Sequence, residues 1–323
     1  MKCSKALKTT LLAILVLNLV AVSHGRLRYN FYNGRCGQHN VEAIIQSIVK
    51  NSFTTDPKIV AGLLRLQFHD CAVNGCDASI LLDGPDSEKT ASPNLSVFGY
   101  DLIDQIKVVL EAVCPGVVSC SDIIIAATRD ATVLAGSPPF QVQMGRRDSL
   151  VSLASNVNLP SPDISVSNAI QFFGSKGLNP FDMVLLLGAH TVGVCHCSVI
   201  NDRLYNYMGT SQPDPSMNPS YMNVLRNHYC PMGQADNSYV YLDDPSSALS
   251  IDNSYYKQLM NNKGILPIDQ ALTHDGSTGW MVDLLANATD FPSLFTQALV
   301  KLGRVEVLTG RRGQIRRNCR RIN

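Results

Sequence analysis

The chain has 323 residues, of which 45% are hydrophobic and 16% are charged, and its formal net charge at pH 7 is +1. This near-neutral composition gives no basis for a nucleic-acid or acidic-polymer partner, while the length allows a large buried core in one or two domains. No shift in composition marks a domain boundary, so we expect one globular body.

Residues 1–25 have the pattern of a secretory signal peptide. Three lysines precede a largely apolar stretch over Leu11–Val22, and small residues, Ser23 and Gly25, stand at the −3 and −1 positions of a cleavage site. A membrane anchor is the alternative, but the stretch is short for a span of ~20 residues. We therefore expect cleavage after Gly25 and a mature chain, residues 26–323, in the extracellular space or cell wall.

The sequence has 10 cysteines, and all but Cys3 lie in the expected mature chain. In an oxidising compartment these nine indicate a disulfide framework with one thiol left over, although many connectivities remain open. Cys195, His196 and Cys197 resemble a zinc cluster, but secretion favours a disulfide for at least one of the two thiols. The nine are Cys36, Cys71, Cys76, Cys114, Cys120, Cys195, Cys197, Cys230 and Cys319.

Helical periodicity dominates the mature chain. Apolar residues recur at helical spacing over 41–49 and 101–110, and 59–68 also reads as a helix. Alternating strand patterns are scarce, and no internal repeat is present. The sequence therefore predicts a mostly α-helical protein with long, ordered loops.

Capping signals predict two further helices. Ser121 and Asp122 stand before an apolar run and are typical of a cap followed by a buried helix. Asn179 is a helix cap with Pro180 at the first helical position, ahead of an apolar run. Proline- and glycine-rich loops separate the helices at 136–139, 159–162, 212–215 and 275–279.

Two surface features can be read from polar residues. N-x-S/T sequons begin at Asn94 and Asn287, and Asn287 is the candidate glycan site because its surroundings are polar. Arginines between 311 and 321 are interspersed with polar residues, which predicts a solvated tail.

The segment from Arg65 to Ser79, RLQFHDCAVNGCDAS, concentrates chemistry-bearing residues. On a helix, Arg65 and His69 are four residues apart and project from the same side. A permanent cation beside an imidazole suits an acid–base group that acts next to a developing oxyanion. The alternative is a helix terminus at which His69 contacts the last carbonyls and Arg65 pairs with an acid.

Oxygen donors follow directly after His69. Asp70, Asp77 and Ser79, together with carbonyls of the Val73–Gly75 turn, form a set of hard ligands that suits Ca²⁺. Cys71 and Cys76 are close enough to cross-link over this loop. So short a ring gains little entropy in the unfolded state, so we expect the bridge to fix the geometry of the ion site.

A second histidine, His190, ends the apolar run LLLGAHT. Apolar surroundings disfavour the charged imidazole, and a neutral imidazole that borders a cavity is a good metal ligand. The alternative is a buried histidine that one backbone carbonyl satisfies.

Taken together, these stretches resemble the secretory plant (class III) haem peroxidases. The resemblance implies a helical fold that holds haem b between a distal and a proximal half. It also implies an enzyme that reduces hydrogen peroxide to water while oxidising phenolic donors by one-electron steps. The matching stretches, in family order, are RLQFHDCAVNGCDASILLD at 65–83, VSCSDIIIAATRDA at 118–131, GRRDS at 145–149, LPSP at 159–162, LLGAHTVG at 186–193, IDNSYY at 251–256, KGILPIDQAL at 263–272 and GQIRRNC at 313–319.

The resemblance assigns catalytic roles on the distal side. His69 matches the base that moves a proton between the two peroxide oxygens, and Arg65 stabilises charge on the departing oxygen. Asn94 matches the residue that orients the ring of His69, so its sequon is expected to be buried and silent. Phenolic donors would approach the haem edge near Pro160.

On the proximal side, His190 matches the iron ligand and Asp269 matches the carboxylate that accepts its other ring N–H. Such a carboxylate makes the imidazole more basic and stabilises iron in high oxidation states. Phe68 is expected to contact the haem.

The resemblance also implies two calcium sites and a disulfide pairing. The distal calcium would use Asp70, the carbonyls of Val73 and Gly75, Asp77, Ser79, and Glu88 through water. The proximal calcium would use Thr191, Asp244, Ser247, the carbonyl of Ser250, and Asp252. The implied bridges are Cys36–Cys114, Cys71–Cys76, Cys120–Cys319 and Cys197–Cys230, which leave Cys195 unpaired.

Several positions depart from the family pattern, Ser247 in place of the commoner Thr among them, and two other functions stand as alternatives. Ala72 and Phe98 stand where Phe and Arg are usual, and the segment after Asn94 is one residue short. One alternative is a haem-binding extracellular protein of the same fold with little activity. The other is a calcium-stabilised hydrolase that uses His69 and Asp70 with a serine, but it lacks a G-x-S-x-G motif. We expect the protein to be monomeric.

Overall fold

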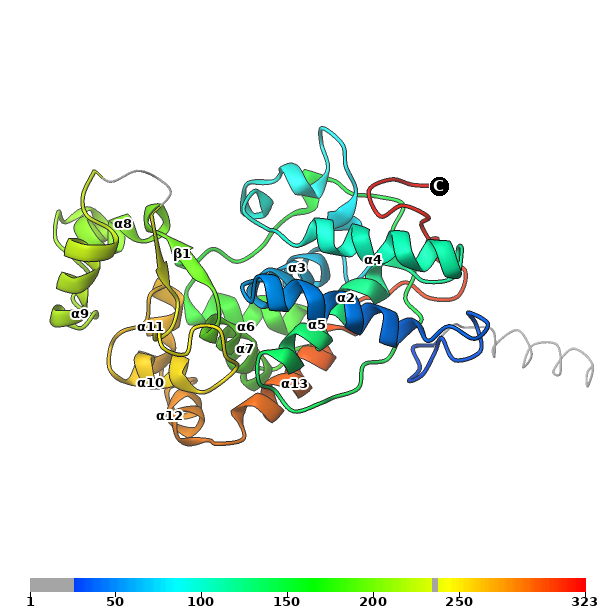
Figure 1. The fold of residues 1–323 in the computed structure, drawn as a ribbon. Helices are drawn as coiled ribbons and strands as arrows, with labels where there is room; N and C mark the ends of the chain where they lie inside the picture. The colour runs from blue at the N-terminus through cyan, green and yellow to red at the C-terminus, as the bar shows by residue number, and fades with distance from the viewer. Residues whose placement is uncertain (1–25, 234–237) are drawn as a thin grey trace, which may run out of the picture.

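A computed structural model describes residues 26–233 and 238–323 of the chain, so the expected signal peptide lies outside the described residues. Figure 1 shows a mostly helical protein with one small two-stranded sheet, as the periodicity predicts. In these two ranges no helix has the length and apolar character needed to cross a membrane. The helices are α2 Val41–Thr55, α3 Ile59–Val73, α4 Tyr100–Val113, α5 Cys120–Leu134, α6 Val166–Ser175, α7 Pro180–Leu187, α8 Cys197–Tyr205, α9 Pro219–Val224, α10 Ser254–Met260, α11 Pro267–His274, α12 Gly279–Asn287 and α13 Phe291–Leu302, and the strands are β1 Val194–His196 and β2 Tyr239–Tyr241.

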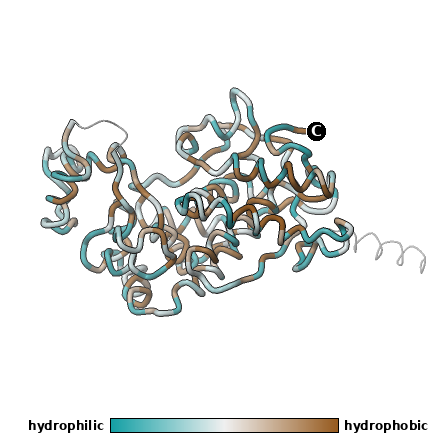
Figure 2. Tube along the Cα trace, in the orientation of Figure 1, coloured by the Kyte–Doolittle hydropathy of each residue, from teal (hydrophilic) through white to brown (hydrophobic). Residues whose placement is uncertain are grey.

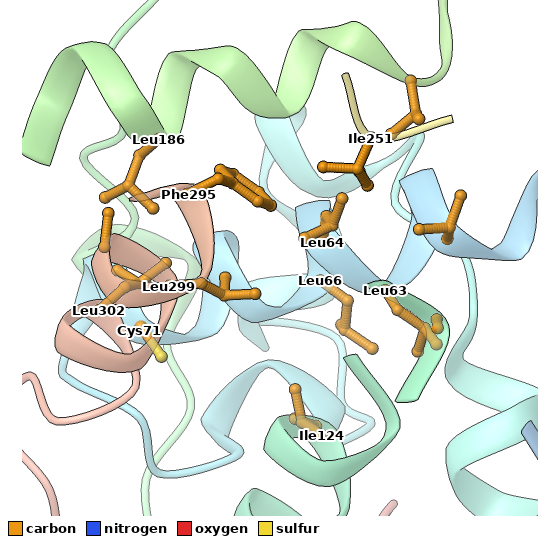
Figure 3. Packing of buried hydrophobic residues seen from close by; sticks show 14 of the residues in the cluster. Leu63, Leu64, Leu66, Cys71, Ile124, Leu186, Ile251, Phe295, Leu299 and Leu302 are labelled. Carbon is orange, nitrogen blue, oxygen red and sulfur yellow. The ribbon is translucent and has the colours of Figure 1, made fainter. Parts of the chain in front are cut away.

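Helix α3 lies in the middle of the molecule (Figure 1) and packs against α5 and α2, while Gln67 of α3 donates a hydrogen bond to the Leu299 carbonyl of α13. The hydropathy colouring of Figure 2 places brown, apolar segments along these inner helices. In Figure 3, Leu63 and Leu66 lie toward Ile124 of α5, while Leu299 and Leu302 of α13 lie nearby. All five side chains are nearly inaccessible to solvent, and this burial is the main source of stability for the helical body.

The helix that carries Arg65 and His69 is longer than the sequence predicts. It was expected to end at Phe68, but α3 continues to Val73, because no helix-breaking residue precedes Asn74 and Gly75. Gly75 has a φ of +98°, which a residue with a Cβ rarely adopts, and so ends the helix. As a result Asp70 lies on the last turns of α3, directly after His69, and not in a loop.

The caps of two helices were expected from the sequence, one correctly. Asn179 caps α7 through a reciprocal pair of hydrogen bonds with Asp182, with Pro180 at the first position. The cap of α5 is Ser119, which accepts a hydrogen bond from the Asp122 backbone N–H at 3.1 Å, so the expectation of Ser121 was wrong. The Ser121 hydroxyl instead donates to a distant carbonyl, that of Cys76, at 2.8 Å.

Four disulfides join the described residues, and all four pairs implied by the family resemblance are confirmed. Cys195 is buried and unpaired among the cysteines of the described ranges. The bridges are Cys36–Cys114, Cys71–Cys76, Cys120–Cys319 and Cys197–Cys230.

The expectation of a solvated C-terminal tail was wrong for two arginines. Arg316 is fully buried and donates hydrogen bonds to the carbonyls of Cys319 and Ala78, at 2.6 and 2.8 Å. Arg320 pairs with Asp104 of α4 at 2.5 Å. The terminal segment therefore packs against the loop around Ala78 and against α4, because buried carbonyls and a carboxylate offer these guanidinium groups partners that a solvated tail lacks.

Candidate active site

His69 is held in one tautomer by its neighbours. It is buried on α3, and its Nδ1 lies 2.6 Å from Oδ1 of Asn94. The amide of Asn94 is oriented in turn, because its Nδ2 donates to the carbonyl of Glu88 at 2.7 Å. Nδ1 of His69 must therefore carry the proton, which leaves the lone pair of Nε2 available as a base.

The surroundings keep the imidazole of His69 neutral. Burial and the nearby positive charge of Arg65 lower the pKa of His69 to about 4, although the hydrogen bond to Asn94 opposes this effect. At neutral pH the ring is thus a neutral base, protonated at Nδ1 alone, beside a permanent cation. This is the arrangement that the sequence predicted for an acid–base group.

Arg65 is positioned by backbone and hydroxyl oxygens. Its Nε donates to Nε2 of His69 at 3.2 Å, and Nη2 donates to the carbonyl of Pro93 at 3.0 Å. Nη1 donates to the carbonyl and hydroxyl of Ser96. No carboxylate forms an ion pair with Arg65 in the described parts of the chain. The alternative in which Arg65 pairs with an acid is therefore wrong. The shortened segment after Asn94 still supplies two oxygens to the guanidinium.

His190 lies in the short 3₁₀ turn that follows α7, and Asp269 of α11 contacts it. Its Nδ1 lies 2.9 Å from Oδ1 of Asp269, whose side chain is fully buried, while 27% of the His190 side chain is exposed. Burial lowers the pKa of His190, but the charge and hydrogen bond of Asp269 outweigh burial and leave the pKa raised. Nε2 makes no hydrogen bond to the described residues, so one basic ring nitrogen is free to bind a metal.

The distal and proximal residues occupy one region of the protein. The charge of Arg65 lowers the pKa of His190, and the charges of both Arg65 and Asp269 act on the buried thiol of Cys195. Because such effects fall off with distance, these groups from separate segments are electrostatic neighbours.

Two further predicted residues border this region. The ring of Phe68 lies 5.9 Å from the His69 ring and stacks on Phe173 of α6, also at 5.9 Å. Pro160 is partly exposed in its loop. This loop is attached to α11, since the carbonyl of Pro162 accepts a hydrogen bond from the Ile268 N–H at 2.9 Å. Ile268 is adjacent to Asp269, so this hydrogen bond places the loop next to the segment that carries the carboxylate.

The oxygen donors after His69 gather into a buried cluster. Three of its oxygens, Asp70 Oδ1, Ser79 Oγ and Glu88 Oε2, have no hydrogen-bond partner in the described ranges. Burial raises the pKa of Asp77 to about 6 and of Glu88 to about 7, and burial and the charge of Asp77 raise the pKa of Asp70. Buried, unpartnered carboxylates of this kind fit a hard cation that would compensate their charge.

Val73 and Gly75, which were expected to add carbonyl ligands, are both buried beside this cluster. The Val73 carbonyl accepts a hydrogen bond from Lys176 Nζ at 2.9 Å, and its second lone pair stays available. No group of three or more His, Cys, Asp or Glu side chains is spaced to hold a metal within 26–233 and 238–323, so a cation here would need hydroxyl and carbonyl ligands as well.

The second cluster of oxygens surrounds Thr191, next to His190. Its hydroxyl lies 2.9 Å from Oδ2 of Asp243, 3.3 Å from the Ser250 carbonyl and 3.5 Å from Oδ1 of Asp252. The hydroxyl of Ser247 is buried and has no partner among the described residues. These five oxygen-bearing residues fit a second hard cation.

The expected ligand Asp244 makes no hydrogen bond with the Thr191 hydroxyl. Its carboxylate instead accepts hydrogen bonds from Ser246 and Gln258 near the surface. Asp243 is buried, and burial raises its pKa to about 6. Adjacent aspartates point in different directions after an extended strand, and motif spacing alone could not choose between them.

Comparison with known proteins relates the whole chain to one group. Residues 45–288 match the family model described as peroxidase. Among curated proteins of Arabidopsis thaliana, the chain is 47% identical to Peroxidase 57 and 46% identical to Peroxidase 28, over 96% of this chain and 97% of each relative. It is 45% identical to Peroxidase 60 over 98% of this chain and 97% of that protein.

Proposed function

This chain belongs to the class III plant peroxidases, and on that premise we propose that His69, Arg65, Asn94, His190 and Asp269 form its catalytic site for the oxidation of phenolic donors. Membership of this family makes the chain an oxidoreductase that uses a peroxide and a reductant. It does not favour the alternative of a haem-binding protein without activity. The observation that carries the site assignment is that a neighbouring side chain orients each histidine at Nδ1. Nε2 of His190 then has no partner among the described residues, and Nε2 of His69 accepts a hydrogen bond only from Arg65.

Haem is the cofactor that the family implies, and the residues fit it. His190 would hold the iron through Nε2, with Asp269 keeping the ring basic and correctly rotated, and Phe68 would contact the macrocycle. When bound, haem supplies the iron that binds the peroxide and stores the oxidising equivalents.

The distal residues carry the proton and the charge. Neutral His69 accepts a proton at Nε2 from the peroxide and returns it to the departing oxygen, and Asn94 keeps Nδ1 protonated throughout. Arg65 stabilises the negative charge that develops as the O–O bond breaks, and it needs no reorganisation because Ser96 and Pro93 already hold it.

Two calcium ions would stabilise the chain segments that carry the two histidines. The distal ion would use Asp70, the Val73 and Gly75 carbonyls, Asp77, Ser79 and Glu88, and the proximal ion would use Thr191, Asp243, Ser247, the Ser250 carbonyl and Asp252. Asp70 is adjacent to His69 and Thr191 is adjacent to His190. Each ion would therefore fix the chain segment that carries one histidine.

We further propose a secreted monomer that acts on small phenols near Pro160. The four disulfides suit an oxidising compartment. Asn287 is exposed, so its sequon is accessible to a glycan, whereas Asn94 is buried. Peroxide-dependent oxidation of guaiacol by the haem-loaded protein tests the function. No oxidation by a protein with an intact Soret band would instead support a haem-binding role.

A further inference from the structure

Tyr255 has no role in the site described so far, although it lies in the IDNSYY stretch. It is 1% exposed on α10, and its hydroxyl donates a hydrogen bond to Oδ1 of Asp269 at 2.8 Å. The same oxygen lies 2.9 Å from Nδ1 of His190. Oδ2 of Asp269 is buried and has no partner among the described residues. One carboxylate oxygen thus serves both donors.

We propose that Tyr255 is a positioning residue that sets how strongly Asp269 attracts the Nδ1 proton of His190, and so tunes the reduction potential of the iron. This inference rests on the proposed role of His190 as iron ligand. A phenolic O–H that donates to Oδ1 stabilises the negative charge on this oxygen. The oxygen then pulls less strongly on the imidazole N–H, so the ring is a weaker electron donor to the metal.

The surrounding aromatic residues hold the Tyr255 hydroxyl in place. Its ring meets the ring of His190 edge-on, with centroids 6.0 Å apart and planes at 79°. The ring of Tyr256 lies 4.9 Å from that of Tyr255 and packs in turn on the ring of Phe291 at 5.1 Å. Tyr255 therefore contacts both members of the His190–Asp269 pair from one fixed position, and its donor is preorganised.

Tyr256 provides a matched control. It is also fully buried on α10, but its hydroxyl donates to the backbone carbonyl of Val184 at 3.0 Å and not to Asp269. Tyr256→Phe removes the same atom from the same kind of surroundings as Tyr255→Phe. The two variants differ only in which acceptor loses its hydrogen-bond donor.

The test is a potentiometric titration of the ferric/ferrous couple in the haem-loaded protein, with resonance Raman measurement of the iron–histidine stretch. In Tyr255→Phe the midpoint potential is expected to become more negative and the stretching frequency to rise, while Tyr256→Phe leaves both at wild-type values. Replacing Tyr255 by 3-fluorotyrosine keeps the ring and makes the hydroxyl a stronger donor. The potential is then expected to shift in the positive direction, a result that does not depend on whether the phenylalanine variant folds.

Two results would overturn the inference. One is an unchanged potential in both Tyr255 variants, and the other is an equal shift in Tyr256→Phe. A wild-type protein that shows no iron–histidine stretch would instead overturn the proposed iron ligation, and the role of Tyr255 with it. A normal iron–histidine stretch with an unmoved potential would overturn the role of Tyr255 alone.

Discussion

Nε of Arg65 lies 3.2 Å from Nε2 of His69, so the guanidinium lies beside the one ring nitrogen that Asn94 leaves unprotonated. A base and an anion-stabilising cation therefore share one small region. Burial and this cation together keep His69 neutral. Catalysis and stability are therefore expected to depend on this pair and on the oxygen clusters that flank the two histidines.

Replacing His69 by Leu should leave the haem spectrum intact but slow the reaction with peroxide. General base catalysis of this kind is commonly worth ~10²–10⁴-fold in rate, and Leu cannot accept a proton. Stopped-flow mixing with hydrogen peroxide measures the effect. A rate constant equal to that of the wild type would refute the role of His69.

The rate constant with peroxide should be independent of pH at neutrality and fall as the pH drops through about 4, the pKa of His69. The sign follows from the lowered pKa, because the neutral base is present only above it. Asn94→Ala removes a hydrogen bond that raises this pKa, so the midpoint should move to still lower pH. A midpoint that moves upward in Asn94→Ala would contradict the assignment of Asn94.

His190→Ala should weaken the retention of haem, because the free Nε2 and its Asp269 partner are lost together. Haem content after gel filtration, read from the Soret absorbance, measures the effect. His196→Ala is the matched control, since His196 is exposed on the neighbouring strand β1. Equal haem content in all three proteins would exclude His190 as the ligand.

Removal of calcium with EGTA should lower the melting temperature on the order of 5–10 °C, since a ligand at 100-fold its Kd stabilises the folded state by ~2.7 kcal/mol.

Without the ion, the pKa values of Asp77 and Glu88 in the folded protein are raised to about 6 and about 7, so ionisation of these two carboxyl groups is unfavourable there. Below the pKa that these carboxyl groups have in the unfolded chain, the raised pKa values stabilise the folded state. This stabilisation is lost as the pH rises through 6 to 7. The EGTA-treated protein should thus melt at higher temperature at pH 5 than at pH 8. An identical pH profile with calcium present would contradict the distal site.

Asp243 and Asp244 offer a test of the proximal site. Asp243→Ala should reduce the stabilisation by calcium, because its carboxylate contacts Thr191, whereas Asp244→Ala should not. Calorimetric melting of both variants with and without calcium provides the comparison. A loss of stabilisation confined to Asp244→Ala would reverse the assignment.

The sequence predicts those parts of the fold that local patterns determine. The periodicity around Val41 and Asp101 correctly predicts α2 and α4, and Asn179 with Pro180 correctly predicts the start of α7. The disulfide pairs follow from the family resemblance and are confirmed. The contact of His69 with Asn94 was also expected from it, and the structure contains this contact.

Other features depend on tertiary packing that local patterns do not encode. Ser119 and not Ser121 is the cap because α5 begins at Cys120, so that Ser121 lies inside the helix and its hydroxyl donates to the distant Cys76 carbonyl. The burial of Arg316 depends on carbonyls more than 200 residues earlier in the chain, such as that of Ala78. The hydrogen bond from Tyr255 to Asp269 joins two helices, and their spacing in the sequence does not predict that they are in contact.

The central claim is that His69 and His190 lie on opposite sides of one haem. A crystal structure of the haem-loaded protein tests it most directly. We expect Nε2 of His190 within bonding distance of the iron, and His69 with Arg65 over the other side of the macrocycle without an iron bond. Haem bound elsewhere, or both histidines on the same side of it, would contradict the claim.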